Sequence, residues 1–409
     1  MRRTGVVIGV LTLACGILSA CGTTSGPPQP GPPRGPALTT DFSHTGPGAL
    51  VSAEGLVDLD QQLRDRSSLA ARIVYESTSG VNDSHSLVTG TVFVPNGTPP
   101  PGGWPIAAFA HPATGIQAPC APSASPSLMG SAKDVAALLD AGFLVTATDY
   151  QGLGLRDTDH SSADPSIGPF NGYHPFLDST TEGYNVIDAV RAARTLVPSA
   201  STSFAAYGIG QGGQAAWAAD ELAADYRGGL TLVGVAAIRP TAALGGLADA
   251  AANGTLTRDQ QTTLQQYLAA LGHENDDFPL DAYRHGVVKQ QWDVLSSCWG
   301  PAVADRTHAV ERIGPADLRP DGPDAEQVLR GYLQKTTLPQ APAAAPMLIV
   351  PDGPEGPIPP EWTGAAVTAA CGMGDVITLG APDAAPVTWL TGRFAGSAPQ
   401  NDCPVPPTG

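Results

Sequence analysis

Positive charge is scarce in this chain of 409 residues. Lysine and arginine together number 21, of which only three are lysine, against 38 acidic residues, so the formal net charge is −17. Removing residues 1–20, which hold Arg2, Arg3 and no acid, gives −17 − 2 = −19. Such an acidic chain is a poor candidate for binding DNA, RNA or an anionic membrane through charge. We expect no nucleic-acid partner and interpret the acidity as solubilising surface.

Metal-ligand patterns are also missing. None of the six cysteines has the spacing of a zinc site, so we expect no metal and no cofactor. Aromatic residues make up 6% of the chain and charged residues 14%, whereas 42% is apolar, which is ample for a sizeable core. The 40 prolines and 48 glycines are spread between periodic segments, which indicates a globular protein with a proline-rich tether.

The N-terminal apolar run, residues 4–18, is too short for a comfortable transmembrane helix. It follows two arginines and ends in Leu18-Ser19-Ala20-Cys21, which resembles the bacterial lipobox, whose cysteine is lipidated. We therefore expect residues 1–20 to be a lipoprotein signal peptide and Cys21 to carry a lipid anchor. The protein is then exported and held at the extracytoplasmic face of the cell membrane. A simple secretory signal cut nearby is the alternative.

Apart from Cys15 in the leader and the expected lipidation site Cys21, four cysteines remain: Cys120, Cys298, Cys371 and Cys403. An even number in an exported chain predicts two disulfides, and four cysteines allow three connectivities. Among these we favour Cys120–Cys298 and Cys371–Cys403.

Residues 21–38 are rich in proline and glycine and predict an extended or disordered tether. From residue 39 to residue 409, strand and helix patterns alternate, which predicts one α/β domain with a mostly parallel sheet covered by helices on both faces. The expected strands are residues 72–77, 87–94, 106–110, 143–148, 204–207, 232–238, 347–350 and 376–379. The expected helices are residues 131–141, 182–196 and 211–226.

Between about residues 240 and 345 the alternation breaks. Thr257 and Gln260 have the spacing of a capping box and predict a helix that ends at Gly272. An insertion at this point is expected to lie over the carboxyl ends of the strands, where open α/β sheets bind ligands. We interpret it as a helical cap.

The segment Gly208-Ile209-Gly210-Gln211-Gly212 joins the expected strand at 204–207 to the expected helix at 211–226. This is the strand–turn–helix context of the G-x-S-x-G nucleophile elbow of α/β-hydrolases. Gly210 stands at the position of the serine, so the turn is present and its nucleophile is missing.

Several further motifs occur in a consistent order, and together they make the chain resemble the secretory lipase family of α/β-hydrolases, found in actinobacteria and fungi. The resemblance runs from about residue 72 to Cys403 and rests on His111-Pro-Ala-Thr-Gly115, Asp149-Tyr-Gln-Gly-Leu-Gly154, His174-Pro-Phe-Leu177, Glu182-Gly183, the elbow, Pro359-Pro360, Trp389-Leu390 and Arg393-Phe-Ala-Gly396. It identifies the chain as a lipoprotein member whose catalytic triad has degenerated.

The resemblance implies a Ser–Asp–His triad, and each position departs from it. The serine position is Gly210, and the acid position falls on Glu355, in a loop altered by two prolines; a surface acid with no role is the alternative for Glu355. The histidine would fall near Pro382-Asp383, yet the last histidine of the chain is His308. No base follows the acid position to accept the nucleophile's proton.

The oxyanion loop departs as well, because Pro112 has no N–H to donate. The N–H of Gln211 remains as one donor. We expect His111 and His174 to be structural hydrogen-bonding residues. Two acids, Asp149 and Glu182, are expected to accept from loop backbone amides. Ser201 and Ser203 precede the elbow strand and are expected at its wrong end for a substitute nucleophile.

We therefore expect an exported, lipid-anchored and catalytically inactive pseudo-lipase that retains a pocket for a lipid or acyl-ester ligand. One alternative, which family resemblance alone favours, is an active triacylglycerol lipase or carboxylesterase in lipid catabolism. Another is a structural or partner-binding envelope lipoprotein.

Overall fold

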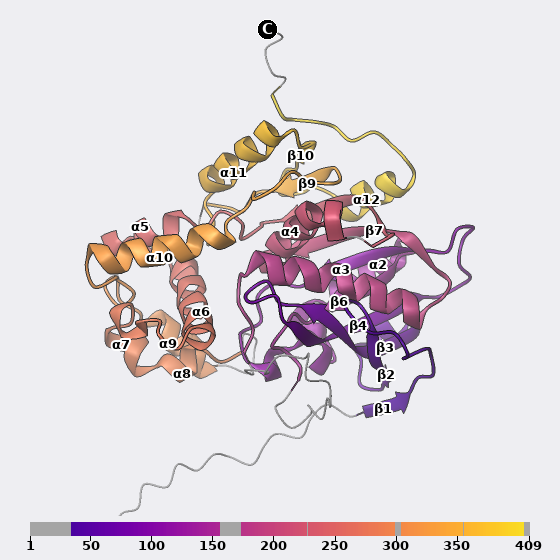
Figure 1. Cartoon of the computed structure of the whole chain (residues 1–409), viewed down its shortest axis with the longest axis horizontal. Helices are drawn as coiled ribbons and strands as arrows, with labels where there is room; N and C mark the ends of the chain where they lie inside the picture. The colour runs from indigo at the N-terminus through magenta and orange to yellow at the C-terminus, as the bar shows by residue number, and fades with distance from the viewer. Residues whose placement is uncertain (1–33, 156–172, 227, 299–303, 355, 405–409) are drawn as a thin grey trace, which may run out of the picture. The chain divides into compact units, whose positions relative to one another are not determined.

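The computed structural model describes residues 34–155, 173–226, 228–298, 304–354 and 356–404 (Figure 1). The expected signal peptide, the lipidation site Cys21, the tether up to residue 33 and the acid position Glu355 lie outside these residues. In the described part of the chain, no helix is both long and apolar enough to cross a membrane.

A single ten-stranded sheet organises the described residues, in the order β1-β2-β3-β4-β6-β5-β7-β8-β9-β10. Strands β1 to β4 and the β4–β6 pair are antiparallel, whereas all neighbours from β6 to β10 are parallel. The bounds are β1 Arg34–Ala37, β2 Leu50–Leu56, β3 Ser67–Thr78, β4 His85–Pro95, β5 Trp104–Ala110, β6 Leu144–Thr148, β7 Ala200–Ile209, β8 Thr231–Ile238, β9 Met347–Val350 and β10 Ile377–Leu379. The predicted, mostly parallel α/β sheet is confirmed.

Alternate residues of β5 face two different hydrophobic cores. Ile106, Ala108 and Ala110 belong to the core that includes buried residues of α3, α4 and α11. Ala107 and Phe109 belong to the core beneath α2 and α12. Side chains alternate between the two faces of a strand, so helices cover both faces of the sheet, as predicted. The helices concerned are α1 Gln61–Arg64, α2 Ala132–Asp140, α3 Ser179–Leu196, α4 Gln211–Tyr226, α11 Pro360–Met373 and α12 Pro386–Phe394.

The end of the predicted tether is a strand. Arg34–Ala37 forms β1 and pairs with β2, with Arg34 opposite Leu56. A Cβ on Gly35 would lie 1.9 Å from the carbonyl oxygen of Gly55, so glycine is what permits this pairing. Proline is tolerated here because β1 is the outermost strand and needs few backbone donors. The end of the predicted extended tether is thus a strand of the sheet, a pairing that the sequence analysis did not predict.

A helical segment of residues 240–345 separates β8 from β9. Its helices are α5 Gly246–Asn253, α6 Arg258–Glu274, α7 Gly286–Gln290, α8 Trp292–Leu295, α9 Ala304–Glu311 and α10 Pro323–Thr336. They share a hydrophobic core, which also includes Ile116, Phe176, Leu177 and Ile358 from outside the segment, and they group on one side of the sheet (Figure 1). The capping box of Thr257 and Gln260 is confirmed. The helix runs past the predicted end at Gly272 to Glu274, because one glycine weakens a helix without stopping it.

The last residues of the helical segment, 340–345, lead from α10 to β9 and are called the return segment. Three buried carboxylates hold its backbone, each through one oxygen. Oε2 of Glu221 accepts the N–H groups of Gln340 (2.9 Å) and Ala341 (3.1 Å), Oδ1 of Asp375 accepts that of Ala343 (2.9 Å), and Oδ1 of Asp220 accepts that of Ala345 (2.8 Å).

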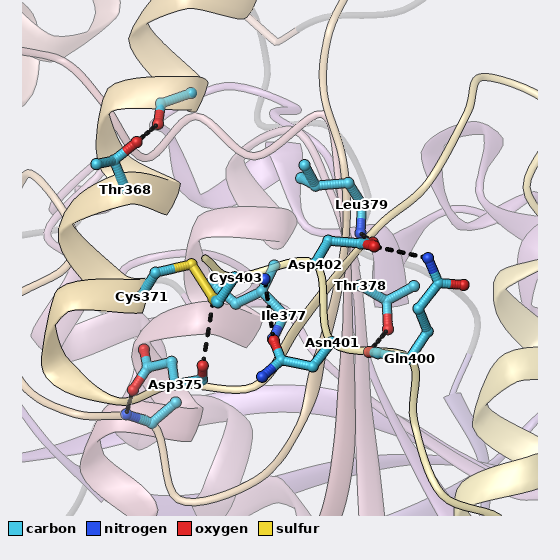
Figure 2. The surroundings of a disulfide bond; sticks show 12 residues. Thr368, Cys371, Asp375, Ile377, Thr378, Leu379, Gln400, Asn401, Asp402 and Cys403 are labelled. Atoms are coloured by element: carbon cyan, nitrogen blue, oxygen red, sulfur yellow. Dashed lines mark hydrogen bonds between the residues drawn. A yellow bond between two sulfur atoms is a disulfide. The ribbon is translucent and has the colours of Figure 1, made fainter. Parts of the chain in front are cut away.

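The described residues contain two disulfides, and both are the pairs favoured in the sequence analysis. Cys120–Cys298 joins the loop after β5 to the helical segment. Cys371–Cys403 joins α11 to the C-terminal segment, residues 400–403 (Figure 2). This segment lies along β10: Oδ1 of Asn401 accepts the N–H of Ile377 (3.3 Å), and Oδ2 of Asp402 accepts that of Leu379 (2.8 Å).

Candidate functional site

Gly210 forms a sharp turn between β7 and α4. Its φ is +60°, in the left-handed region that glycine adopts at no steric cost. Its N–H donates to the carbonyl of Ile238 (2.9 Å), and its carbonyl accepts from the N–H groups of Thr241 (3.0 Å) and Gln214 (3.2 Å). The turn is therefore fixed on both sides, with the geometry of a nucleophile elbow.

The flanking glycines are required by close backbone contacts, and Gly210 is not. A Cβ on Gly208 would lie 1.8 Å from the carbonyl oxygen of Gly212, and one on Gly212 would lie 1.9 Å from that of Ala110. At Gly210 the nearest heavy atom to an added Cβ is Cβ of Pro112, at 3.9 Å. The elbow thus has room for a side chain at the position where the sequence supplies none.

The oxyanion side of the elbow is partly closed. Pro112 lies beside Gly210 and has no N–H to offer. Gln211 is buried and begins α4, so its N–H is one of those that a helix leaves without an intrahelical acceptor. One backbone donor of the expected pair is therefore available.

The side chain of Gln211 belongs to a buried polar trio with His174 and Glu182. Its Nε2 donates to Oε1 of Glu182 (2.7 Å) and to Nε2 of His174 (2.5 Å). Nδ1 of His174 lies 2.9 Å from the carbonyl of Gln151, which fixes the proton on Nδ1 and the lone pair on Nε2. The carboxylate also accepts the N–H of Leu177 (2.9 Å). The trio fastens the start of α4 to the start of α3.

Burial keeps this histidine neutral. It lowers the pKa of His174 to about 4, against the opposing hydrogen bond to Gln151. Burial also raises the pKa of Glu182 well above its ordinary value, although Gln211 and Leu177 donate to it. Both imidazole nitrogens of His174 are in use, so this histidine has no free nitrogen for a nucleophile's proton.

The other histidine of the quoted motifs is structural too. Nδ1 of His111 lies 2.7 Å from the carbonyl of Pro112, and its ring packs on Tyr150 with centroids 4.4 Å apart. Burial lowers the pKa of His111 to about 4. Asp149 accepts the N–H of Ser123 (2.8 Å) and the hydroxyl of Thr89 (2.6 Å). These contacts agree with the structural roles expected for His111, His174, Asp149 and Glu182.

The loop after β10 supplies no imidazole. It runs through residues 380–386, where Pro382 and Asp383 are exposed, and the last histidine, His308, lies in α9. Ser201 and Ser203 lie in the first half of β7, at the opposite end from Gly210, as expected. The sequence analysis did not predict the hydrogen bonds of the Gln211 side chain. The motifs that contain its partners, His174 and Glu182, were the only indication of them in the sequence.

Comparison with known proteins now identifies this scaffold. Residues 130–306 match the secretory lipase family. The match confirms the predicted resemblance. A comparison with curated protein sequences finds no match.

Solved structures confirm the α/β-hydrolase fold predicted from the elbow. Candida antarctica lipase A in its closed state aligns with a TM-score of 0.66 at 14% identity, covering 88% of this chain and 84% of that one. A ligand-bound form of the rice cell wall degrading esterase LipA from Xanthomonas oryzae aligns with a TM-score of 0.64 at 19% identity, covering 86% and 95%. A hydrolase described as putative, from Legionella pneumophila, aligns with a TM-score of 0.63 at 16% identity, covering 84% and 94%.

Proposed function

We propose that this protein is an exported, lipid-anchored pseudo-lipase that binds an apolar or acyl ligand and does not hydrolyse it. The observation that carries the proposal is Gly210, which adopts the elbow conformation and leaves the space of the missing nucleophile open. The secretory lipase match supports export. The lipobox ending at Cys21 supports the anchor.

The chemistry of ester hydrolysis argues for inactivity. A serine hydrolase needs a nucleophile, a base that takes its proton and an acid that orients the base. Loss of the nucleophile alone costs on the order of 10⁶ in turnover in comparable enzymes. Here Gly210 has no side chain, and no histidine follows His308 in the sequence. A serine restored at position 210 would therefore still lack a base to take its proton.

The ligand-binding half of the proposal rests on the retained scaffold. The elbow geometry, the N–H of Gln211 and the helical segment at residues 240–345 are all kept. We propose that this segment acts as a cap on the domain of residues 39–409 and covers an acyl pocket at the carboxyl ends of the strands.

A test of activity uses the full-length lipoprotein in detergent. It is treated with a fluorophosphonate probe and with p-nitrophenyl esters from butyrate to palmitate, beside the same sample after heat denaturation. We expect no labelling and no turnover above the denatured control. Turnover clearly above it would overturn the proposal and favour the active lipase or carboxylesterase.

A test of ligand binding uses native mass spectrometry of the same purified protein. We expect a co-purifying lipid that is released on denaturation. If no lipid is retained and a fluorescent fatty acid fails to bind, the acyl pocket is excluded and a structural or partner-binding lipoprotein remains.

A further inference from the structure

A cleft of about 230 Å³ opens between the helical segment and the residues that precede α3. Its walls include Tyr267 and Glu274 of α6, Tyr332 and Lys335 of α10, and Phe176 and Asp178. None of its lining residues belongs to the elbow, residues 208–212. The volume is below the roughly 300–1,000 Å³ of pockets for drug-sized ligands, so the cleft suits a small molecule.

Two carboxylates face this cleft without a cation of their own. Oδ1 of Asp178 caps α3 by accepting the N–H of Thr181 (2.8 Å). Glu274 is partly buried at the end of α6, where the negative end of the helix further disfavours its charge. Burial, with the nearby charge of Asp178, raises the pKa of Glu274 to about 8. No ion pair to either carboxylate occurs among the described residues.

A buried phenol in the same wall also lacks a partner. Tyr267 is 2% exposed, and its Oη has no hydrogen bond in the described structure. The hydroxyl of Thr336, which donates to the carbonyl of Leu333 (3.3 Å), lies nearby but not in hydrogen-bond geometry with Oη. A buried hydroxyl oxygen without a partner is costly, and a cation placed against it in the cleft would offset part of that cost.

The aromatic rings of the cleft suit a cation. Tyr267, Tyr332 and Phe176 all contribute to its lining. Nζ of Lys335, at the rim, lies 5.1 Å from the ring centroid of Tyr332. The ring of Tyr332 therefore already contacts an ammonium group of the protein itself. Because Lys335 is exposed, this contact lies on the solvent side of the ring.

We propose that this cleft binds a small organic ammonium ion. Glu274 and Asp178 neutralise the charge, and the rings of Tyr267, Tyr332 and Phe176 pack against its methyl or methylene groups. The described residues contain no cluster of metal-ligating side chains, which sets the site apart from a metal centre. The proposal is independent of the elbow, because the two regions share no residue.

Isothermal titration of the full-length protein with tetramethylammonium chloride, at constant ionic strength and pH 9, tests the proposal. The uncharged tert-butanol serves as a probe of similar shape without the charge. We expect saturable binding of the cation at least tenfold tighter than that of the alcohol. Equal affinities, or no binding of either, would overturn the proposal.

Two variants test the residues. Glu274→Gln should weaken tetramethylammonium binding about tenfold, whereas Glu361→Gln, an exposed acid at the start of α11, should leave it unchanged. Lys335→Met should strengthen binding several-fold, because it removes the competing cation at the rim. Lys335 is exposed, so Lys335→Met should fold normally. It can therefore test the site even if Glu274→Gln folds poorly. Unchanged affinity in both variants contradicts the site.

Discussion

Cβ of Pro112 is the nearest heavy atom to a Cβ built on Gly210, and the two lie 3.9 Å apart. The position of the missing nucleophile is therefore neither filled nor blocked. An elbow without its nucleophile can be filled by another side chain or left empty, and the elbow at Gly210 is left empty.

Gly210→Ser should fold and remain inactive. The left-handed conformation costs a non-glycine residue about 1–2 kcal/mol, so a modest fall in melting temperature is expected. Hydrolysis of p-nitrophenyl butyrate should stay at the wild-type background, because a serine alone lacks a base. Gly208→Ser is the matched control: its Cβ would lie 1.8 Å from the carbonyl oxygen of Gly212, so it should be far less stable. Activity gained by Gly210→Ser would show that a base is already in place.

Gln211→Met should destabilise the protein by about 1–3 kcal/mol. The change keeps the side-chain length but removes the donor shared by His174 and Glu182, which leaves buried polar atoms unpaired. Urea unfolding measures the loss. Gln334→Met, an exposed position on α10, controls for the chemistry of the substitution and should change the free energy of unfolding by less than about 0.5 kcal/mol. Equal effects at both positions would contradict a structural role for the trio.

The carboxylate of Glu221 should make stability fall as pH rises. Burial raises the pKa of Glu221 from 4.5 to about 7, against the N–H groups that Gln340 and Ala341 donate to it. The folded protein therefore keeps a proton that the unfolded chain releases. The resulting contribution is complete below about pH 4.5 and is lost as the pH rises to about 7.

Glu221→Gln should flatten this dependence. Its Oε1 can still accept both N–H groups of the return segment, but it no longer titrates. Thermal melts between pH 4 and pH 8 should show a shallower decline than in the wild type, whereas Glu361→Gln should follow the wild-type curve. A variant whose melts decline as steeply as those of the wild type would assign the titration to another group.

Removing the Cys371–Cys403 disulfide should loosen the C-terminal segment. The bond closes a sequence separation of 32 residues, for which chain entropy predicts a loss of about 4 kcal/mol at most. In the double variant Cys371→Ser/Cys403→Ser, the amide hydrogens of Ile377 and Leu379 should exchange faster. The reason is that the side chains of Asn401 and Asp402 are no longer held in place to accept them. The amides of β5, at the centre of the sheet, should exchange at an unchanged rate relative to global unfolding. Exchange that is unaltered at β10 would show that the segment holds without the disulfide.

Local patterns in the sequence predicted the elements that surround the elbow. The bounds of α4 and β9 were obtained as predicted, since each is a compact periodic segment between turn residues. Neither of the first two strands was predicted. In β1, Gly35 and Pro36 favour a turn or linker until the partner strand is known. The trio of Gln211, His174 and Glu182 was missed as a unit, because its members come from separate segments that only the fold brings together.

The C-terminal segment has a consequence for assembly. An outermost strand normally offers unpaired N–H groups to any other extended chain, and so invites edge-to-edge association. On β10 the amides of Ile377 and Leu379 are already taken by the side chains of Asn401 and Asp402, and a covalent bond at Cys403 keeps those side chains in place. Formation of the Cys371–Cys403 disulfide would thus also close this end of the sheet to self-association, so that copies brought close together would stay separate there.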